Sequence, residues 1–159
     1  MKVKMVGICG GSWGDGGVGK TAVANIISKQ MGFYPISFVD PVKDLAKKFF
    51  GWDGKMDKEA RILLDGICRL GRGISEDYWM NLTLARIPHE VEKIVFDDVM
   101  FDNEAKMIAS SGGVVVVVEK AGHSSPIMPC EVVHLDNNGS LADLNRMSVL
   151  IISQALSGV

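Results

Sequence analysis

The sequence has few cysteines, no long apolar run and little net charge, and each of these shortages excludes a class of protein. Its three cysteines are an odd number without CxxC or Cys/His spacing, which excludes a disulfide scaffold, gives no sign of a zinc site and favours a reducing compartment. The most apolar run, residues 114–118, is far shorter than the roughly 18 residues that a membrane-spanning helix needs. The net charge of −2 provides no electrostatic case for binding nucleic acid.

The N-terminal segment MKVKMVGICGG has neither the apolar stretch nor the cleavage site of a signal peptide. We therefore expect a soluble, cytoplasmic protein without nucleic-acid or membrane partners. With 159 residues, of which 47% are hydrophobic and 23% charged, the chain suits one globular domain with a sizeable core. Glycine is abundant, since the chain has 18 and six of them lie between positions 10 and 19.

Strands alternate with helices along the chain, as judged from apolar periodicity and turn residues. The predicted strands cover residues 3–8, 36–39, 94–97, 114–118 and 131–135. The predicted helices cover residues 19–31, 41–50, 57–65, 76–87 and 103–110, with a last helix from 141 onward. The five consecutive valines at 114–118 indicate a strand covered on both faces, as in a parallel sheet. The pattern predicts an α/β fold with a mainly parallel sheet, interrupted by a functional insertion whose Gly- and Arg-rich segment 66–73 links two helices.

Capping residues mark the start of two predicted helices. Pro41 suits the first turn of a helix, and Asp40 suits the cap before it. Ser140 and Asp143 have the spacing of a capping box for the last helix. The apolar face predicted for that last helix consists of Leu141, Leu144, Met147 and Ile151.

The segment GDGGVGKT at residues 14–21 matches the phosphate-binding pattern GxxxxGK[ST] without a mismatch. Its glycines allow backbone N–H groups to point at one anion, and the following helix adds its positive end. We expect Lys20 to reach the β and γ phosphates and the Thr21 hydroxyl to ligate Mg²⁺. The predicted nucleotide-binding residues are therefore Gly14, Gly16, Gly17, Val18, Gly19, Lys20 and Thr21.

Acidic residues follow two of the predicted strands. Asp97 ends the strand 94–97, where a carboxylate beside the phosphate loop would meet Mg²⁺ directly or through water. Asp98 is either a substrate contact or a turn residue. Asp40 is a helix cap, a substrate contact or both, and Lys43 either binds an acceptor phosphate or is an ordinary surface lysine.

Three arginines, Arg61, Arg69 and Arg72, fall within twelve residues. A hydroxyl acceptor in phosphoryl transfer needs a base such as Asp40, whereas a phosphate acceptor is already ionised and mainly needs cations that grip it. The arginines therefore favour a phosphate acceptor, with Arg61 as the candidate for an ordinary surface charge. Trp79 either stacks on a base or belongs to the core.

The order of these motifs resembles the phage-type deoxynucleoside monophosphate kinases, within the P-loop nucleoside monophosphate kinase group. The matching pieces are the phosphate loop, FVDPVK at 38–43, FFGW at 49–52, RILL at 61–64, GR at 71–72, DYW at 77–79, FDDVMFDNEA at 96–105 and NGSL at 138–141. The resemblance implies a P-loop NTPase three-layer fold with a mainly parallel five-stranded sheet. It also implies a helical substrate-binding insertion over about 51–90 and a short mobile lid over about 119–130.

The same resemblance implies an activity and its cofactors. The expected reaction is ATP- and Mg²⁺-dependent phosphorylation of a deoxynucleoside monophosphate to the diphosphate. Lys20, Asp40 and Arg72 are the implied catalytic residues. Lys43, the other two arginines, Trp79 and Asp98 complete the implied substrate site. A homodimer is the default expectation, and the compartment would be the host cytoplasm if the protein is phage-encoded.

Two features depart from the family pattern. The family usually has an arginine where this chain has Met100, and the lid region carries no arginine. Lys120 or Arg146 would have to supply the missing cation, while His123 is expected to make local hydrogen bonds. The departures keep two alternatives open, which are a kinase with a hydroxyl acceptor, similar to dephospho-coenzyme A kinase, and a nucleotide-binding module without turnover.

Overall fold

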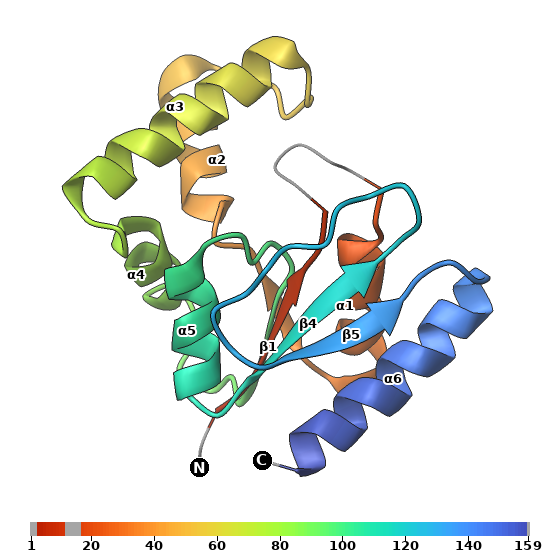
Figure 1. Cartoon of the computed structure of the whole chain (residues 1–159). Helices are drawn as coiled ribbons and strands as arrows, with labels where there is room; N and C mark the ends of the chain where they lie inside the picture. The colour runs from red at the N-terminus through yellow and green to blue at the C-terminus, as the bar shows by residue number, and fades with distance from the viewer. Residues whose placement is uncertain (1–2, 12–16, 159) are drawn as a thin grey trace. The chain divides into compact units, whose positions relative to one another are not determined.

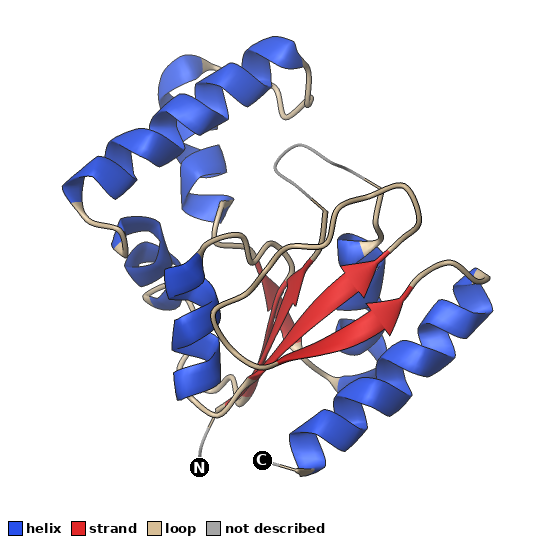
Figure 2. Cartoon of the chain, viewed as in Figure 1, coloured by secondary structure: helices blue, strands red, loops and turns tan. Residues whose placement is uncertain are grey.

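The chain divides into two compact units in the computed structural model, which describes residues 3–11 and 17–158. The sheet unit comprises Met1–Ile36 and His89–Val159, and the helical unit comprises Ser37–Pro88. Helices and strands alternate in the first unit, whereas the second contains helices and turns (Figure 2). The helices of the sheet unit are α1 (Lys20–Met31), α5 (Asp102–Ser110) and α6 (Leu141–Ser157). Those of the helical unit are α2 (Asp40–Phe50), α3 (Lys58–Ile74) and α4 (Tyr78–Leu84).

Five parallel strands form a single sheet in the order β2-β3-β1-β4-β5. Figure 1 shows β1, β4 and β5 side by side in that order. Their bounds are Lys4–Cys9 for β1, Tyr34–Ile36 for β2, Lys93–Phe96 for β3, Val114–Glu119 for β4 and Val132–Asp136 for β5. The strand before the phosphate loop, β1, is therefore the central one. The predicted α/β fold with a parallel five-stranded sheet is confirmed.

Helices cover both faces of this sheet. Alternate residues of a strand point to opposite faces, so Val114, Val116 and Val118 join the core beneath α1 and α6. On the other face α5 packs on β1 and β4, and a Cβ added at Gly7 would lie 2.6 Å from Cδ1 of Ile108. All five valines of β4 are consequently buried, as the unbroken valine run predicts.

The second strand lies earlier in the chain than predicted, at Tyr34–Ile36 instead of 36–39. A proline in its middle is tolerated because β2 is an edge strand, where a missing N–H leaves no partner strand unsatisfied. The chain turns directly afterward, since the Asp40 N–H donates to the Ser37 carbonyl at 3.2 Å. This turn replaces the strand end predicted at Asp40.

The predicted capping role of Asp40 is wrong, because this residue already belongs to the first turn of α2. Val39 occupies the cap position, and Pro41 follows in the first turn. The Asp40 carboxylate accepts a hydrogen bond from the Ser37 N–H at 3.0 Å. The carboxylate thus points back along the chain and stabilises the turn before the helix.

The predicted link at 66–73 is wrong, because α3 runs through it without a break. Its buried residues recur at helical spacing along the whole length, at Ala60, Leu64, Ile67, Cys68 and Gly71. Asp57 caps its start by accepting a hydrogen bond from the Ala60 N–H at 2.8 Å. The next helix, α4, is shorter than the predicted 76–87.

Packing explains why a glycine stands inside this helix. A Cβ added at Gly71 would overlap the indole ring of Trp79, whereas one added at Gly66 would meet nothing within 4 Å. Gly71 therefore makes room for the Trp79 ring. The packing of this ring offsets the entropic cost of a glycine inside a helix. The glycines of 66–73 predict a break in the helix, but the fold uses Gly71 for close packing against Trp79.

The capping box of the last helix is confirmed, since Ser140 accepts a hydrogen bond from the Asp143 N–H and the Asp143 carboxylate accepts one from the Ser140 N–H. The Ser140 hydroxyl also donates to the Asp143 carboxylate at 2.6 Å, and this bond, together with the one from the Ser140 N–H, lowers the pKa of Asp143. Its predicted apolar face is only partly right, because Leu141 is exposed while Leu144, Ser148 and Ile152 are buried. In residues 3–11 and 17–158, no helix is long and apolar enough to cross a membrane.

Candidate active site

The phosphate loop follows the carboxyl end of β1. Within the described part of the loop, Gly17 and Gly19 have φ angles of 98° and 102°, in the left-handed region that favours glycine. Gly19 is also the N-cap residue of α1, and no described side chain caps that helix. The first N–H groups of α1 are thus left for a ligand, which is the arrangement an anion needs. The predicted binding residues Gly14 and Gly16 lie outside the described residues.

Lys20 is the first residue of α1 and extends back across the loop. Its Nζ donates to the Gly10 carbonyl oxygen at 2.8 Å. Thr21 follows on the next position and is exposed, so its hydroxyl is available to a ligand. The structure therefore brings the ammonium group, the helix N-terminus and the hydroxyl together at the end of the central strand.

Two side chains from neighbouring strand ends contact the outer side of the loop. Lys120, directly after β4, donates from Nζ to the Gly17 carbonyl at 3.1 Å. Asn137, directly after β5, donates from Nδ2 to the Val18 carbonyl at 2.8 Å. Asn137 was not predicted, although its position just after a strand of a parallel sheet is a signal that could have found it.

The predicted acidic residues lie at the same edge of the sheet. Phe96 pairs with Gly7 in the β1–β3 ladder, so the half-buried Asp97 and Asp98 follow at the carboxyl end of β3. The Val99 N–H then donates to the Ile8 carbonyl at 3.0 Å, which holds this segment beside the end of β1. Thr21 and Asp97 are the oxygen donors that could hold Mg²⁺ here. Among the residues that the structure describes, no group of three or more His, Cys, Asp or Glu side chains is arranged to hold a metal.

Cys9 occupies the last position of β1, below the phosphate loop. Its Sγ donates to the Val116 carbonyl at 3.3 Å. Burial raises the pKa of this thiol from 9.0 to about 12, outweighing the opposite effect of the Lys20 charge. The thiol is therefore neutral at physiological pH and is a packing residue, not a nucleophile.

In the helical unit, the three predicted arginines share one face of α3, because their spacing of eight and three residues follows the helical repeat. Arg69 pairs through Nε with Asp65 at 2.9 Å, and its side chain is 80% exposed. Arg72 donates from Nη1 to the Glu76 carbonyl at 3.0 Å, and Arg61 is exposed. The unbroken helix thus aligns charges that the predicted link would have left unaligned.

The remaining predicted residues of this unit lie on α2 and α4. Asp40 and Lys43 are half-buried in the first turn of α2. Trp79 is only 6% exposed, donates from Nε1 to the Cys68 carbonyl at 2.8 Å and makes an edge contact with the Tyr78 ring. These contacts match the core role for Trp79, which was one of its two predicted roles.

The segment after β4 contains the candidate lid residues. His123 contacts the Ala121 carbonyl through Nδ1 at 3.3 Å, in keeping with local hydrogen bonding. Of the two cations proposed to replace a lid arginine, Lys120 reaches the phosphate loop. Arg146 instead pairs with Asp143 at 3.4 Å on α6, with a side chain that is 74% exposed.

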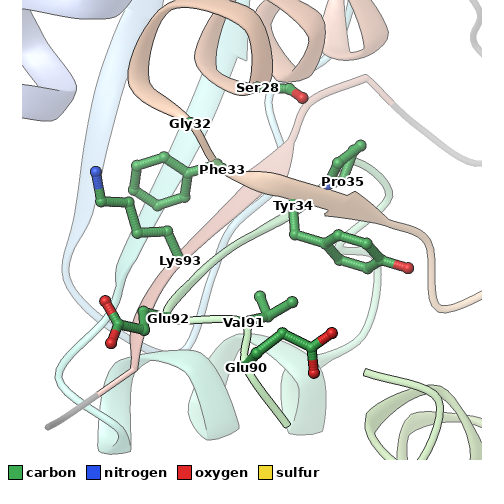
Figure 3. A pocket seen from close by; sticks show the side chains of 9 residues that line it. All are labelled: Ser28, Gly32, Phe33, Tyr34, Pro35, Glu90, Val91, Glu92 and Lys93. Atoms are coloured by element: carbon green, nitrogen blue, oxygen red, sulfur yellow. The ribbon is translucent and has the colours of Figure 1, made fainter. Parts of the chain in front are cut away.

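A cavity of about 510 Å³ lies elsewhere on the sheet unit (Figure 3). Residues 32–35 and 90–93 line it together with Ser28, so it adjoins the beginning of β2 and β3. Ligands of open parallel sheets bind at the carboxyl ends of the strands. The cavity is therefore distinct from the site built around the phosphate loop.

Comparison with known proteins supports the fold. No protein-family model matches the chain. A protein of Acanthamoeba polyphaga mimivirus described as "Putative deoxynucleotide monophosphate kinase" is 24% identical over an aligned region that covers 76% of each chain.

Two solved structures are similar over nearly the whole length. A gluconokinase from Sinorhizobium meliloti 1021 has a TM-score of 0.52 and 15% identity, covering 99% of this chain and 95% of its own. A "putative kinase" from Chloroflexus aurantiacus j-10-fl has a TM-score of 0.55 and 11% identity, covering 99% and 98%. With the parallel sheet and the glycine loop after its central strand, these likenesses identify the α/β P-loop NTPase fold.

Proposed function

We propose that the protein transfers the γ-phosphoryl group of ATP to a deoxynucleoside monophosphate, giving the diphosphate and ADP. One observation carries the proposal, which is that Lys20 and the N-terminus of α1, which no described side chain caps, meet at the carboxyl end of β1. Such an end is where a parallel α/β fold binds phosphate. The description of the mimivirus relative supports a deoxynucleotide as the acceptor.

The sheet unit would bind the triphosphate. Backbone N–H groups of the loop would donate to phosphate oxygens, and Lys20 would exchange its bond to the Gly10 carbonyl for the β and γ phosphates. The exposed Thr21 hydroxyl and the half-buried Asp97 carboxylate are oxygen donors at one edge of the sheet, so they suit Mg²⁺. The ion, when bound, offsets the negative charge that gathers on the phosphates during transfer.

The helical unit would bind the acceptor. Arg61, Arg69 and Arg72 share one face of α3, and that concentration of positive charge suits a phosphate group already ionised at neutral pH. Arg72 would stabilise the transferring charge, and Lys43 would add a further cation from α2. Asp40 would contact the acceptor without acting as a base, because a phosphate oxygen has no proton to remove. Asp98, which belongs to the sheet unit, would be a further acceptor contact.

Residues 51–90 would thus serve as the substrate-binding insertion, and residues 119–130 as a lid over the phosphates. A lid that excludes water protects ATP from hydrolysis when no acceptor is bound. Residues 119–130 contain no arginine, so Lys120, which reaches the phosphate loop, would supply the positive charge of the lid.

The direct experiment is to incubate the purified protein with ATP, Mg²⁺ and each of the four deoxynucleoside monophosphates and then to separate the products. Formation of a deoxynucleoside diphosphate is the expected result, and the four rates give the base preference. Parallel reactions contain gluconate and dephospho-coenzyme A as hydroxyl acceptors. Transfer to one of these alone would overturn the acceptor class, and ATP binding without transfer to any acceptor would favour a nucleotide-binding module.

Lys20→Ala tests the assignment of the loop. We expect kcat/KM to fall by at least about 100-fold, because removing one preorganised group that stabilises transition-state charge costs that much. Lys29→Ala, an exposed lysine in the last turn of the same helix, is the matched control and should change kcat/KM by less than about twofold. Equal activity of the two variants would remove Lys20 from the site.

A further inference from the structure

The carbonyl groups of the phosphate loop have partners that the proposed reaction does not use. A loop that directs its N–H groups at an anion directs its carbonyl oxygens away from it, and those oxygens need donors. The Gly17 carbonyl accepts a hydrogen bond from Lys120 Nζ at 3.1 Å, and the Val18 carbonyl accepts one from Asn137 Nδ2 at 2.8 Å. Both donors come from the ends of strands, β4 and β5, and not from the loop itself.

Asn137 is itself held by the backbone at these strand ends. Its N–H donates to the Glu119 carbonyl at 2.8 Å, which ties the residue after β5 to the last residue of β4. The amide group lies against Gly19, where an added Cβ would overlap Nδ2. The glycine at the start of α1 therefore admits the Asn137 side chain as well as the left-handed backbone.

The next residue, Asn138, stabilises the adjoining turn through hydrogen bonds that differ from those of Asn137. Asn138 accepts a hydrogen bond from the Ala121 N–H through Oδ1 at 2.8 Å and donates its own N–H to the Asp136 carboxylate at 2.8 Å. The first of these bonds joins the segments after β4 and β5, which carry the donors to the loop, and the second holds the turn to the end of β5. Hydrogen bonds between the two segments therefore hold Lys120 and Asn137 in place.

We propose that Asn137 and Lys120 are positioning residues of the phosphate loop. By holding the carbonyl groups of Gly17 and Val18, they fix these two peptide groups and keep the N–H groups of Val18 and Gly19 directed at the phosphates before a nucleotide arrives. Donors that are already oriented cost no reorganisation when they meet an anion, so the effect appears in binding of the triphosphate. The inference rests on the proposed function only in requiring that this loop bind polyphosphate.

Asn137→Ala and Asn137→Asp test the first contact, with inorganic tripolyphosphate as the probe in calorimetric titrations. Loss of a single hydrogen bond should weaken binding by about 3- to 10-fold in Asn137→Ala. Asn137→Asp should weaken it further, since a carboxylate cannot donate to the Val18 carbonyl and repels the anion. Asn145→Ala is the matched control, because that half-buried asparagine on α6 accepts its hydrogen bond from Gln30, away from the loop.

Lys120→Ala and Lys120→Arg test the second contact, with the exposed Lys106 of α5 changed to Ala as the control. We expect Lys120→Ala to weaken tripolyphosphate binding by about 3- to 10-fold and Lys120→Arg to restore it, because arginine keeps the donor and the charge. Lys106→Ala should bind as the wild-type chain does.

A purely structural role predicts a different pattern, in which the variants lower the thermal midpoint of the ligand-free protein and raise the KM values of both substrates. A positioning role raises KM for ATP, leaves KM for the acceptor unchanged and keeps the ligand-free midpoint at that of the control variants. Unchanged tripolyphosphate affinity in Asn137→Ala and Lys120→Ala would overturn the inference. A wild-type chain that binds tripolyphosphate but transfers no phosphate from ATP would overturn the proposed reaction alone. A wild-type chain that does not bind tripolyphosphate would overturn both the proposed reaction and the positioning role.

Discussion

The sheet unit and the helical unit bury their apolar residues to different degrees. In the sheet unit, helices cover both faces of β4, and its five valines are at most 7% exposed. In the helical unit, one face of each helix packs inward, and large apolar side chains at least 60% exposed remain on α2 and α3, namely Phe49, Phe50, Ile62, Leu70 and Ile74. The first unit has a closed core covered by helices on both sides of a sheet, whereas in the second α2, α3 and α4 pack on one another.

The same contrast applies to the candidate site residues. In the sheet unit, backbone geometry fixes them, since the loop lies between a central strand and a helix and its carbonyl groups are held by strand-end side chains. In the helical unit they are long cationic side chains along the face of one helix. The proposed triphosphate site is therefore a property of the fold, whereas the proposed acceptor site is a property of side chains that substitution can change without altering the fold.

Alkaline pH would sharpen the contrast most, because it acts on the closed core through Cys9. The unfolded thiol ionises near its usual pKa of 9.0, while the buried thiol stays protonated to about 12, so the folded state holds the extra proton between these values. Stability should fall as pH rises, by about 1.4 kcal/mol for each pH unit above 9. Urea unfolding of wild type and Cys9→Ala at pH 8 and pH 10 measures the difference, and parallel pH profiles would contradict it.

Gly71→Ala would break the helical unit at its central contact. The new methyl group overlaps the Trp79 ring, so the indole must move away from the Cys68 carbonyl that accepts its hydrogen bond. We expect a loss of about 1–3 kcal/mol in the free energy of unfolding, the usual cost of overpacking. Hydrogen exchange should show faster opening of α3 amides and unchanged protection in β4. Equal effects in both would mean that the two units do not differ in this way.

Ser140→Ala provides a matched perturbation of the sheet unit. The substitution removes the hydroxyl that accepts the Asp143 N–H and donates to the Asp143 carboxylate at 2.6 Å, which is the larger cause of the lowered Asp143 pKa, and it leaves the backbone N–H bond in place. We expect a loss of about 1 kcal/mol, typical of an N-cap residue. Because the Asp143 pKa is lowered in the folded state, the wild type's advantage should persist at neutral pH and shrink as pH falls below about 4. An undiminished difference at pH 3 would argue against the capping interaction.

Gly66→Ala should have the smallest effect and the opposite sign. An added Cβ at this position meets nothing within 4 Å, and the residue lies in the interior of α3. Replacing such a glycine should raise the free energy of unfolding by about 0.5–1 kcal/mol, since glycine loses more backbone entropy in a helix. Chemical denaturation beside Gly71→Ala gives the comparison, and destabilisation by Gly66→Ala would show that α3 has a partner on that face.

The sequence allowed the sheet unit to be predicted in detail because its signals are local. Five valines, a glycine-rich loop and the Ser140–Asp143 pair each specify an element within a few residues. The helical unit was predicted less well, because a glycine that ends a helix and a glycine that admits a ring from another helix look alike in sequence. Only the ring of Trp79 distinguishes Gly71 from Gly66. Trp79 lies on the next helix, α4, and its ring contacts Gly71 only in the folded chain.

The candidate site shows the same limit. The loop and its lysine follow from spacing alone, whereas Asn137 enters the site because two strands end side by side, more than a hundred residues after the loop. A pairing between strand ends is a property of sheet order, which no local pattern records. Pro35 is a further case, since its place inside a strand depends on that strand lying at the edge.

The Lys20 ammonium group already has a hydrogen-bond acceptor within the protein, which is the Gly10 carbonyl. Any anion must compete with that internal acceptor, and a hydrogen bond to a charged group contributes about 1.5–3 kcal/mol. A singly charged ion such as chloride gains too little in the loop to offset the exchange, whereas a chain of phosphates meets the lysine and the loop N–H groups together. In the proposed phosphate site, Lys20 would therefore favour anions that bring several charges over those that bring one.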